Sequence, residues 1–303
     1  MVLDLIACIP VYNDWESVTV LLQRLDLEAE QLGLDMSILI LDDGSTEPPP
    51  AHFPQFHNLR AVESLRLRRN LGHQRAIAVG LSFIHANRKA RAVLVMDADG
   101  EDKPEDVKVL YGRCEELGFT HAVFAKRTRR TEGLVFRLGY ISYKAIHLAL
   151  TGVNVDVGNF SVLPWSCLEQ IVVVSELWNH YAAGAALSKL AIEKVNCARG
   201  KRIMGQSKMN ISSLILHGLR AISIYEQVGL RLLTGSFFLS LFAFIGLLIH
   251  GDFSLVLLAI PVLNNLLVVC LLFLFHALRL RSTAEFIPAR DYEFFVAKQS
   301  KLA

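Results

Sequence analysis

The chain has 303 residues, which is enough for one large α/β domain and an additional segment. Its net charge of +2 gives no strong overall positive field, so nucleic acid is not an expected partner. Five scattered cysteines without a CxxC pair argue against a disulfide scaffold and a zinc site. The hydrophobic fraction of 52% is high for a soluble enzyme, and the excess lies after Arg231.

Residues 3–125 alternate between short apolar runs and helical patterns. Strands alternating with helices of this kind predict an α/β fold with a doubly wound, mainly parallel sheet. The expected strands are Leu3–Ile9, Met36–Leu41, Leu59–Leu67, Ala92–Met96 and Thr120–Ala125. The expected helices are Glu16–Leu32, Gly72–Ala86 and Pro104–Leu117.

Three polar clusters follow predicted strands: Pro10–Asp14, Asp42–Ser45 and Asp97–Asp99. Ligands of doubly wound sheets bind beyond the carboxyl ends of the strands, so these clusters predict a binding site there. A capped turn is the alternative interpretation of Asp42–Ser45, because Asp-Gly-Ser sequences form such turns readily.

Asp97 and Asp99 are two carboxylates at positions i and i+2, directly after a buried strand. Such a pair can share a divalent cation, either Mg²⁺ or Mn²⁺. A diphosphate leaving group needs that cation, because its negative charge grows as the bond to the sugar breaks. A lone DxD is common in surface loops, so the prediction depends on its place at a strand end.

Two long apolar runs, 232–249 and 255–278, can each cross about 30 Å of hydrocarbon as a helix. Basic residues flank both outer ends, with Arg220 and Arg231 before the runs and Arg279 and Arg281 after them. This pattern predicts a transmembrane hairpin whose outer ends are cytosolic. The alternative is a buried hairpin in a soluble protein.

Residues 211–228 carry an apolar stripe at helical spacing. This helix either lies on the membrane surface or packs on the preceding domain, and the sequence leaves both open. The N-terminus lacks the features of a signal peptide, so the first domain is expected in the cytosol. The expected organisation is a domain at 1–208, an amphipathic helix at 209–230, the hairpin at 231–280 and a cytosolic tail at 281–303.

Five ordered motifs carry a family resemblance. They are Ile9–Asp14, Asp42–Thr46, Arg69–Gly72, Asp97–Asp99 followed by Pro104-Glu105, and Arg202–Lys208. Residues 3–210 resemble family 2 glycosyltransferases with the GT-A fold. The branch that they resemble contains dolichol-phosphate mannose synthase and the bacterial polyprenyl-phosphate glycosyltransferases, whose two-helix tail is also similar.

The resemblance implies a role for each matching residue. Asp97, Ala98 and Asp99 would contact the ribose and diphosphate of the donor, and the two carboxylates would bind the metal. Arg127 would approach the donor after the fifth strand, and Arg202 and Lys208 would clamp phosphates. The nucleoside pocket would be lined by Pro10, Tyr12, Asp14 and Asp42.

Three positions depart from the family pattern. Asp14 replaces a Glu, and Glu101 replaces the Gln of the mannose synthases. Asn159 stands where many members have an Asp that is a candidate catalytic base, and an amide cannot serve as one. Either Asp156 takes that role, or a phosphate acceptor needs little base catalysis because its second pKa is near 6.

The resemblance therefore implies a membrane-anchored inverting glycosyltransferase that moves a sugar from a nucleotide-sugar donor to a polyprenyl phosphate. Transfer to a hydroxyl of a lipid-linked glycan or glycolipid is the alternative, and a catalytically silent nucleotide-sugar-binding subunit is a second one. The implied location is a bacterial inner membrane, with a multi-pass anchor and a cytosolic catalytic domain. The sequence leaves homo-oligomer formation open.

Overall fold

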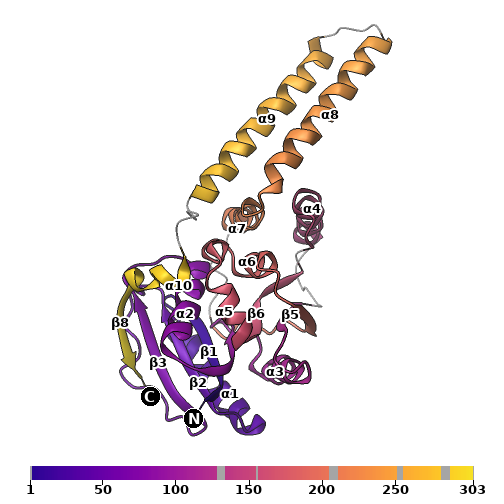
Figure 1. The fold of residues 1–303 in the computed structure, drawn as a ribbon. Helices are drawn as coiled ribbons and strands as arrows, with labels where there is room; N and C mark the ends of the chain where they lie inside the picture. Colours follow the sequence, from indigo (N-terminus) through magenta and orange to yellow (C-terminus); the bar gives the residue numbers. More distant parts are fainter. Residues whose placement is uncertain are drawn as a thin grey trace. The chain divides into compact units, whose positions relative to one another are not determined.

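The structure is a computed structural model that describes residues 2–127, 134–154, 156–204, 211–250, 255–280 and 287–302 (Figure 1). The chain forms two compact units. The sheet unit comprises residues 1–131, 156–208 and 284–303, and the helical unit comprises residues 132–155 and 209–283. The division differs from the expected boundaries, because residues 132–155 join the helical unit and the C-terminal residues join the sheet unit.

The described strands form one sheet in the order β7-β5-β6-β4-β1-β2-β3-β8. They are β1 (Leu3–Val11), β2 (Met36–Asp42), β3 (Leu59–Leu67), β4 (Ala90–Val95), β5 (Ala122–Arg127), β6 (Val157–Pro164), β7 (Ile192–Cys197) and β8 (Val296–Lys301). Strands β4, β1, β2 and β3 are parallel neighbours, whereas β6 and β8 run antiparallel to theirs. The predicted doubly wound, mainly parallel sheet is confirmed.

Helices cover both faces of the sheet, because the central strands are apolar on both sides. On β1, Leu5, Ala7 and Ile9 enter one core, while Ile6 and Cys8 enter the other. Helices α1 (Trp15–Leu32) and α3 (Val107–Glu116), the latter after the short η1 (Pro104–Asp106), cover the first core. The second core is covered by α2 (His73–Asn87), α5 (Trp165–Ile171), η2 (Ser175–Trp178) and α6 (Tyr181–Leu187).

Part of the expected C-terminal tail belongs to the sheet. After α10 (Pro288–Asp291) and η3 (Tyr292–Phe295), β8 pairs antiparallel with β3. Asn87 donates a hydrogen bond of 3.0 Å to the Tyr292 hydroxyl, and the rings of Trp178 and Phe295 lie 4.8 Å apart. These contacts attach the end of the chain to α2 and η2.

The helical unit contains α4 (Leu134–Thr151), α7 (Ile211–Ser223), α8 (Gln227–His250) and α9 (Leu255–Leu280). Figure 1 shows α8 and α9 side by side as a long hairpin. In the part of the chain that the structure describes, two segments are long and apolar enough to cross a membrane, Gln227–Ile249 and Ala259–Leu278. Ser236 donates a hydrogen bond of 2.7 Å to Asn265 and accepts one of 2.8 Å from Asn264, which links the two helices.

The amphipathic helix expected at 211–228 corresponds to α7 and the start of α8. Its apolar residues divide between two environments. Leu214 and Ile215 are exposed, whereas Ala221 and Ile222 are buried within the helical unit. One part of the apolar stripe thus packs against neighbouring helices, and the other part is left uncovered.

Candidate active site

The three predicted polar clusters lie at one edge of the sheet. Strands β4, β1 and β2 are adjacent and parallel, with Cys8 beside Val95 and Val11 beside Asp42. Their carboxyl ends, and the loops that follow them, therefore face the same side. Pro10 is a buried residue of β1, and Tyr12 is 38% exposed just beyond it.

The loops after β1 and β2 are joined through Asn13. Its backbone N–H donates to the Ser45 hydroxyl at 3.0 Å, and its side chain donates to Thr46 Oγ1 at 2.9 Å. Its Oδ1 accepts from the N–H groups of Thr46 and Glu47. Asp14 is partly exposed at the N-cap of α1 and makes no side-chain capping bond there. The loops after β1 and β2 are thus hydrogen-bonded to each other, with Tyr12 exposed and Asp14 partly exposed.

The adjacent Asp42 and Asp43 make different contacts. Asp42 is buried and accepts a hydrogen bond of 2.8 Å from the Ser45 N–H, as in the capped turn considered from the sequence. Asp43 accepts from the N–H groups of Leu71 at 2.7 Å and Gly72 at 2.9 Å, so it holds the Arg69–Gly72 motif beside the second loop. Burial raises the pKa of Asp43 to about 6. Asp43 belongs to the Asp-Asp-Gly-Ser motif but was not among the residues predicted to form the site.

Gly44 allows the close approach of these two loops. Its φ is +68°, and a Cβ at this position would lie 2.6 Å from the backbone carbonyl carbon of Arg69. A side chain is therefore unfavourable here for both its conformation and its volume.

Asp97 and Asp99 lie in a tight loop after β4. Asp102 accepts a hydrogen bond of 3.1 Å from the Asp97 N–H, and Asp99 Oδ1 accepts one of 2.9 Å from the Glu101 N–H. Arg202 donates from Nη2 to Asp99 Oδ2 at 2.7 Å. The predicted phosphate-binding arginine is thus brought directly to the DxD motif.

This loop fits a divalent cation. Burial, followed by the negative charge of Asp97, raises the pKa of Asp99, and a cation between the two carboxylates would offset both effects. Among the described residues, no group of three or more His, Cys, Asp or Glu side chains is arranged to hold a metal ion. Two carboxylates with phosphate oxygens and water are a usual donor set for Mg²⁺.

His73 and Gln74, at the start of α2, were not identified from the sequence. His73 Nε2 lies 3.1 Å from Asp97 Oδ1 and 2.8 Å from Asn159 Nδ2. Gln74 donates to Asn159 Oδ1 at 3.2 Å and accepts from the Tyr181 N–H at 2.6 Å. Both ends of the Asn159 amide are therefore held in place. The only signal in the sequence is their position directly after the Arg69–Gly72 motif.

The environment of His73 favours its charged form. Burial lowers its pKa, but the nearby carboxylates, Asp97 first and then Asp102 and Asp43, outweigh burial and raise the pKa above the ordinary value.

Asp156, the predicted alternative base, is an ion-pair partner in the structure. It accepts a hydrogen bond of 2.6 Å from Lys194 and lies 3.5 Å from the ammonium of Lys126. Burial raises the pKa of Asp156, but the two lysines outweigh burial and lower it overall. Arg127 is the last residue of β5, whereas it was expected just after the fifth strand, and its side chain and Lys208 lie outside the described residues.

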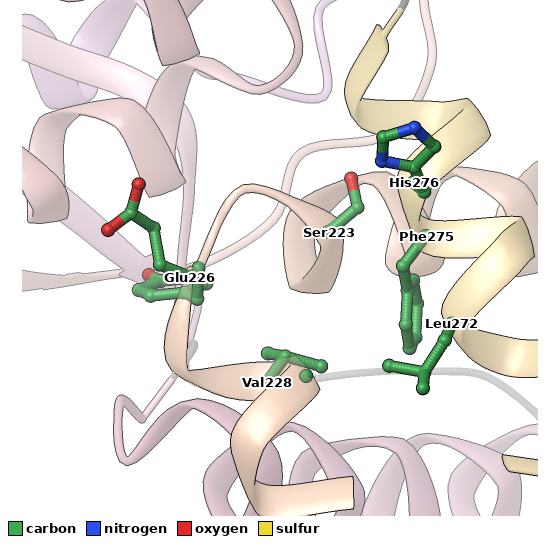
Figure 2. A pocket seen from close by; sticks show the side chains of 8 residues that line it. Ser223, Glu226, Val228, Leu272, Phe275 and His276 are labelled. Carbon is green, nitrogen blue, oxygen red and sulfur yellow. The ribbon is translucent and has the colours of Figure 1, made fainter. Parts of the chain in front are cut away.

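A cavity of about 310 Å³ lies in the helical unit. Figure 2 shows Leu272 and Phe275 of α9 facing Val228 at the start of α8, with Ser223, Glu226 and His276 around them. Gly229 and Tyr225 complete its lining. The cavity combines apolar walls with a polar margin, and no sequence motif indicated it.

The chain is similar to known proteins in both structure and sequence. Glucosyl-3-phosphoglycerate synthase from Mycobacterium tuberculosis, solved with Mn²⁺, UDP-glucose and phosphoglyceric acid, is similar with a TM-score of 0.54. It is 16% identical, and the match covers 76% of this chain and 79% of that one. Mannosyl-3-phosphoglycerate synthase from Rubrobacter xylanophilus matches with a TM-score of 0.48 and 16% identity, over 77% and 75% of the two chains. The first likeness confirms the GT-A fold.

A curated relative, undecaprenyl-phosphate 4-deoxy-4-formamido-L-arabinose transferase from Erwinia tasmaniensis, is 28% identical over 244 residues. The match covers 75% of this chain and 69% of the relative. The family described as glycosyl transferase family 2 matches residues 6–167, which include strands β1 to β6 and the DxD loop. Fold, motifs and family match agree, and the protein is a glycosyltransferase that belongs to glycosyl transferase family 2.

Proposed function

We propose that this protein is a membrane-anchored, metal-dependent, inverting glycosyltransferase that moves a sugar from a nucleotide-sugar donor to a polyprenyl phosphate. The observation that carries the proposal is the state of the two positions where a general base is expected. Asn159 is an amide held by Gln74 and lies beside His73, and Asp156 is held by two lysines. An acceptor that brings its own anionic oxygen matches such a site.

The name of the Erwinia tasmaniensis relative supports the same acceptor class, because that protein acts with undecaprenyl phosphate. A phosphate monoester has a second pKa near 6, so its oxygen is an anion over much of the neutral range. General base catalysis, which typically contributes about 10²–10⁴-fold, is then largely dispensable. A sugar hydroxyl would instead need a carboxylate to take its proton.

The residues divide the work of the reaction. Tyr12, Asp14 and Asp42 would bind the nucleoside, and Asp97 and Asp99 would hold Mg²⁺ or Mn²⁺. That cation would neutralise charge on the diphosphate leaving group. The acceptor phosphate oxygen forms a bond to the anomeric carbon as the bond from that carbon to the diphosphate breaks. The electron pair leaves with the nucleoside diphosphate, and the configuration at the anomeric carbon inverts.

The course of the chain supports membrane anchoring by a hairpin. Strand β8 follows α9 in the sequence and pairs with β3, which precedes α8. Both outer ends of the helix pair must therefore be on one side of any membrane that α8 and α9 cross. Basic residues at these ends, including Arg231 and Arg279, favour the cytosolic side of a bacterial inner membrane.

The cavity of the helical unit is suited to part of the lipid chain of the acceptor. Its walls at Val228, Leu272 and Phe275 are apolar, as an isoprenoid requires. Ser223 and Glu226 contribute the polar margin where a chain would emerge.

The proposal is tested with the purified full-length protein in lipid nanodiscs. The protein is incubated with Mn²⁺ or Mg²⁺, undecaprenyl phosphate and a panel of radiolabelled nucleotide sugars. We expect labelled sugar in the organic phase for one donor, and loss of that product in EDTA. Transfer to a lipid-linked glycan, with no transfer to undecaprenyl phosphate for any donor, would contradict the proposed acceptor.

A further inference from the structure

Arg202 occupies the carboxylate that the proposed metal would need. Its Nη2 donates a hydrogen bond of 2.7 Å to Asp99 Oδ2, and both side chains are mostly buried, at 22% and 14% exposed. A charge-assisted hydrogen bond of this length, partly shielded from water, is among the stronger polar contacts in a protein. The contact is therefore more than a transient surface ion pair.

The backbone of residues 199–203 is attached to the DxD loop independently of the Arg202 side chain. The Gly200 N–H donates to the Glu101 carbonyl oxygen at 2.8 Å, and the Ile203 N–H donates to the Asp99 carbonyl oxygen at 2.8 Å. Arg199 also pairs with the Glu101 carboxylate.

Gly200 makes this close pairing possible. A Cβ on Gly200 would lie 2.5 Å from the Gly100 carbonyl oxygen, so the two segments touch backbone to backbone. The Arg202 side chain can thus change its partner while its backbone stays beside Asp99.

A metal ion and a guanidinium cannot share this carboxylate without cost. A divalent cation binds carboxylate oxygens at about 2.0–2.6 Å, and the positive charge of a guanidinium already on the same group repels it. From this geometry we propose that Arg202 is a coupling residue. It holds Asp99 in the metal-free protein, is displaced when the metal binds, and then contacts the donor diphosphate.

This exchange makes metal and nucleotide binding cooperative. Metal binding alone must break the contact between Arg202 and Asp99 before a diphosphate is present to receive the guanidinium. When a diphosphate is present, it receives the guanidinium, so the cost is offset. Each ligand then raises the affinity for the other by the same factor. The inference depends on the proposed metal role of Asp97 and Asp99.

The test measures Mn²⁺ affinity, not activity. Free Mn²⁺ is titrated by electron paramagnetic resonance with full-length protein in nanodiscs, first alone and then with the member of UDP, GDP, CDP and ADP that binds wild type. We expect Arg202→Ala to bind Mn²⁺ alone about fivefold or more tightly than wild type. The same variant should show a smaller enhancement of Mn²⁺ binding by the nucleotide.

Arg24→Ala is the matched control. Arg24 donates to Glu105 Oε2 at 2.7 Å, so the control removes an arginine paired with a carboxylate of the same segment but not with the DxD motif. It should leave both Mn²⁺ affinities near wild type. An equal gain in Arg24→Ala would show a general effect of charge and would overturn the proposal.

Arg202→Gln, which keeps a donor but lacks the charge, gives a second measurement if Arg202→Ala unfolds. The coupling role alone would be overturned by an Arg202 variant that has wild-type circular dichroism and binds Mn²⁺ without nucleotide as weakly as wild type or more weakly. In that case the wild-type protein would still transfer sugar to undecaprenyl phosphate. Failure of wild type to bind Mn²⁺ at all would instead remove the proposed metal site, and the coupling role with it.

Discussion

Lys194 donates a hydrogen bond of 2.6 Å from Nζ to Oδ1 of Asp156. The ammonium and the carboxylate come from β7 and the residue before β6, two elements on either side of β5. Lys126 of β5 adds a second positive charge 3.5 Å from the same carboxylate. Asp156 is thereby favoured as an anion with two partners, which opposes a role as proton acceptor.

We therefore expect Asp156→Asn to lower the transfer rate by less than about 100-fold, the lower bound typical of general base catalysis. The wild-type rate should fall as the pH drops through about 6, where the acceptor phosphate gains its second proton. A pH–rate profile with saturating undecaprenyl phosphate checks both. Collapse of the folded variant at every pH would assign the proton transfer to Asp156 and favour a hydroxyl acceptor.

The same ion pairs predict a pH dependence of stability. The pKa of Asp156 is lowered in the folded protein, so its ion pairs stabilise the fold above the unfolded pKa of about 4 and lose this effect as the pH falls through the folded value. The stability difference between wild type and Asp156→Asn should shrink on acidification from pH 7. Thermal unfolding followed by near-UV circular dichroism measures it, and a constant difference would contradict the ion-pair role.

The contribution of Asp43 to stability should change with pH in the opposite direction. Its pKa is raised from 3.8 to about 6, so the folded protein disfavours the anion and loses stability as the pH rises between these values. The loss is at most about 3 kcal/mol, because one pKa unit corresponds to about 1.4 kcal/mol. Asp43→Asn lacks this dependence, so its stability relative to wild type should improve from pH 4 to pH 7. A relative stability that is the same at both pH values would contradict the raised pKa.

Asp97→Asn and Asp99→Asn should each reduce transfer by about 100-fold or more. Each removes a carboxylate that would hold the metal, and the metal would neutralise the charge that develops on the diphosphate. Mn²⁺ binding should fall in parallel, while circular dichroism stays at wild type. Asp106→Asn is the control, since Asp106 lies in η1 of the same segment but outside the motif. Full activity of either DxD variant, or of wild type in EDTA, would rule out the metal role.

Gly229→Leu should separate lipid binding from folding. Gly229 lines the cavity of the helical unit, and the nearest atom to an added Cβ, from Leu272, would be 3.6 Å away, an ordinary contact. Leucine is favoured over glycine within a helix by nearly 1 kcal/mol, so thermal stability should hold or rise. The KM for undecaprenyl phosphate should increase severalfold, while the KM for the nucleotide sugar should not change. Equal KM values for the lipid in Gly229→Leu and wild type would show that the chain binds elsewhere.

The sequence was sufficient for the strands from β1 to β5, because each has a short run of apolar or alternating apolar residues and is bounded by polar turns. It was also sufficient for the apolar runs of α8 and α9, but insufficient for the elements between β5 and α7 and for those after α9. Strand β8 contains Lys298, Gln299 and Lys301 and is largely exposed at the sheet edge, so it lacks an apolar pattern.

The site shows the same contrast. The DxD motif and the Asp42–Ser45 loop were predicted because consecutive residues carry their chemistry. The contacts between Arg202 and Asp99, and between Lys194 and Asp156, join residues 103 and 38 positions apart. Such pairings arise only from the order of strands in the sheet, which the sequence of one chain does not display.

The position of β8 constrains how the protein is made. Ribosomes release the strands β1 to β7 first, then α8 and α9, and β8 last. Until α9 has been synthesised, β3 remains an unpaired sheet edge, the kind of surface at which nascent chains associate wrongly. Completion of the sheet therefore reports that both apolar helices have left the ribosome, and a nascent chain arrested within the hairpin would present an open strand to chaperones and proteases.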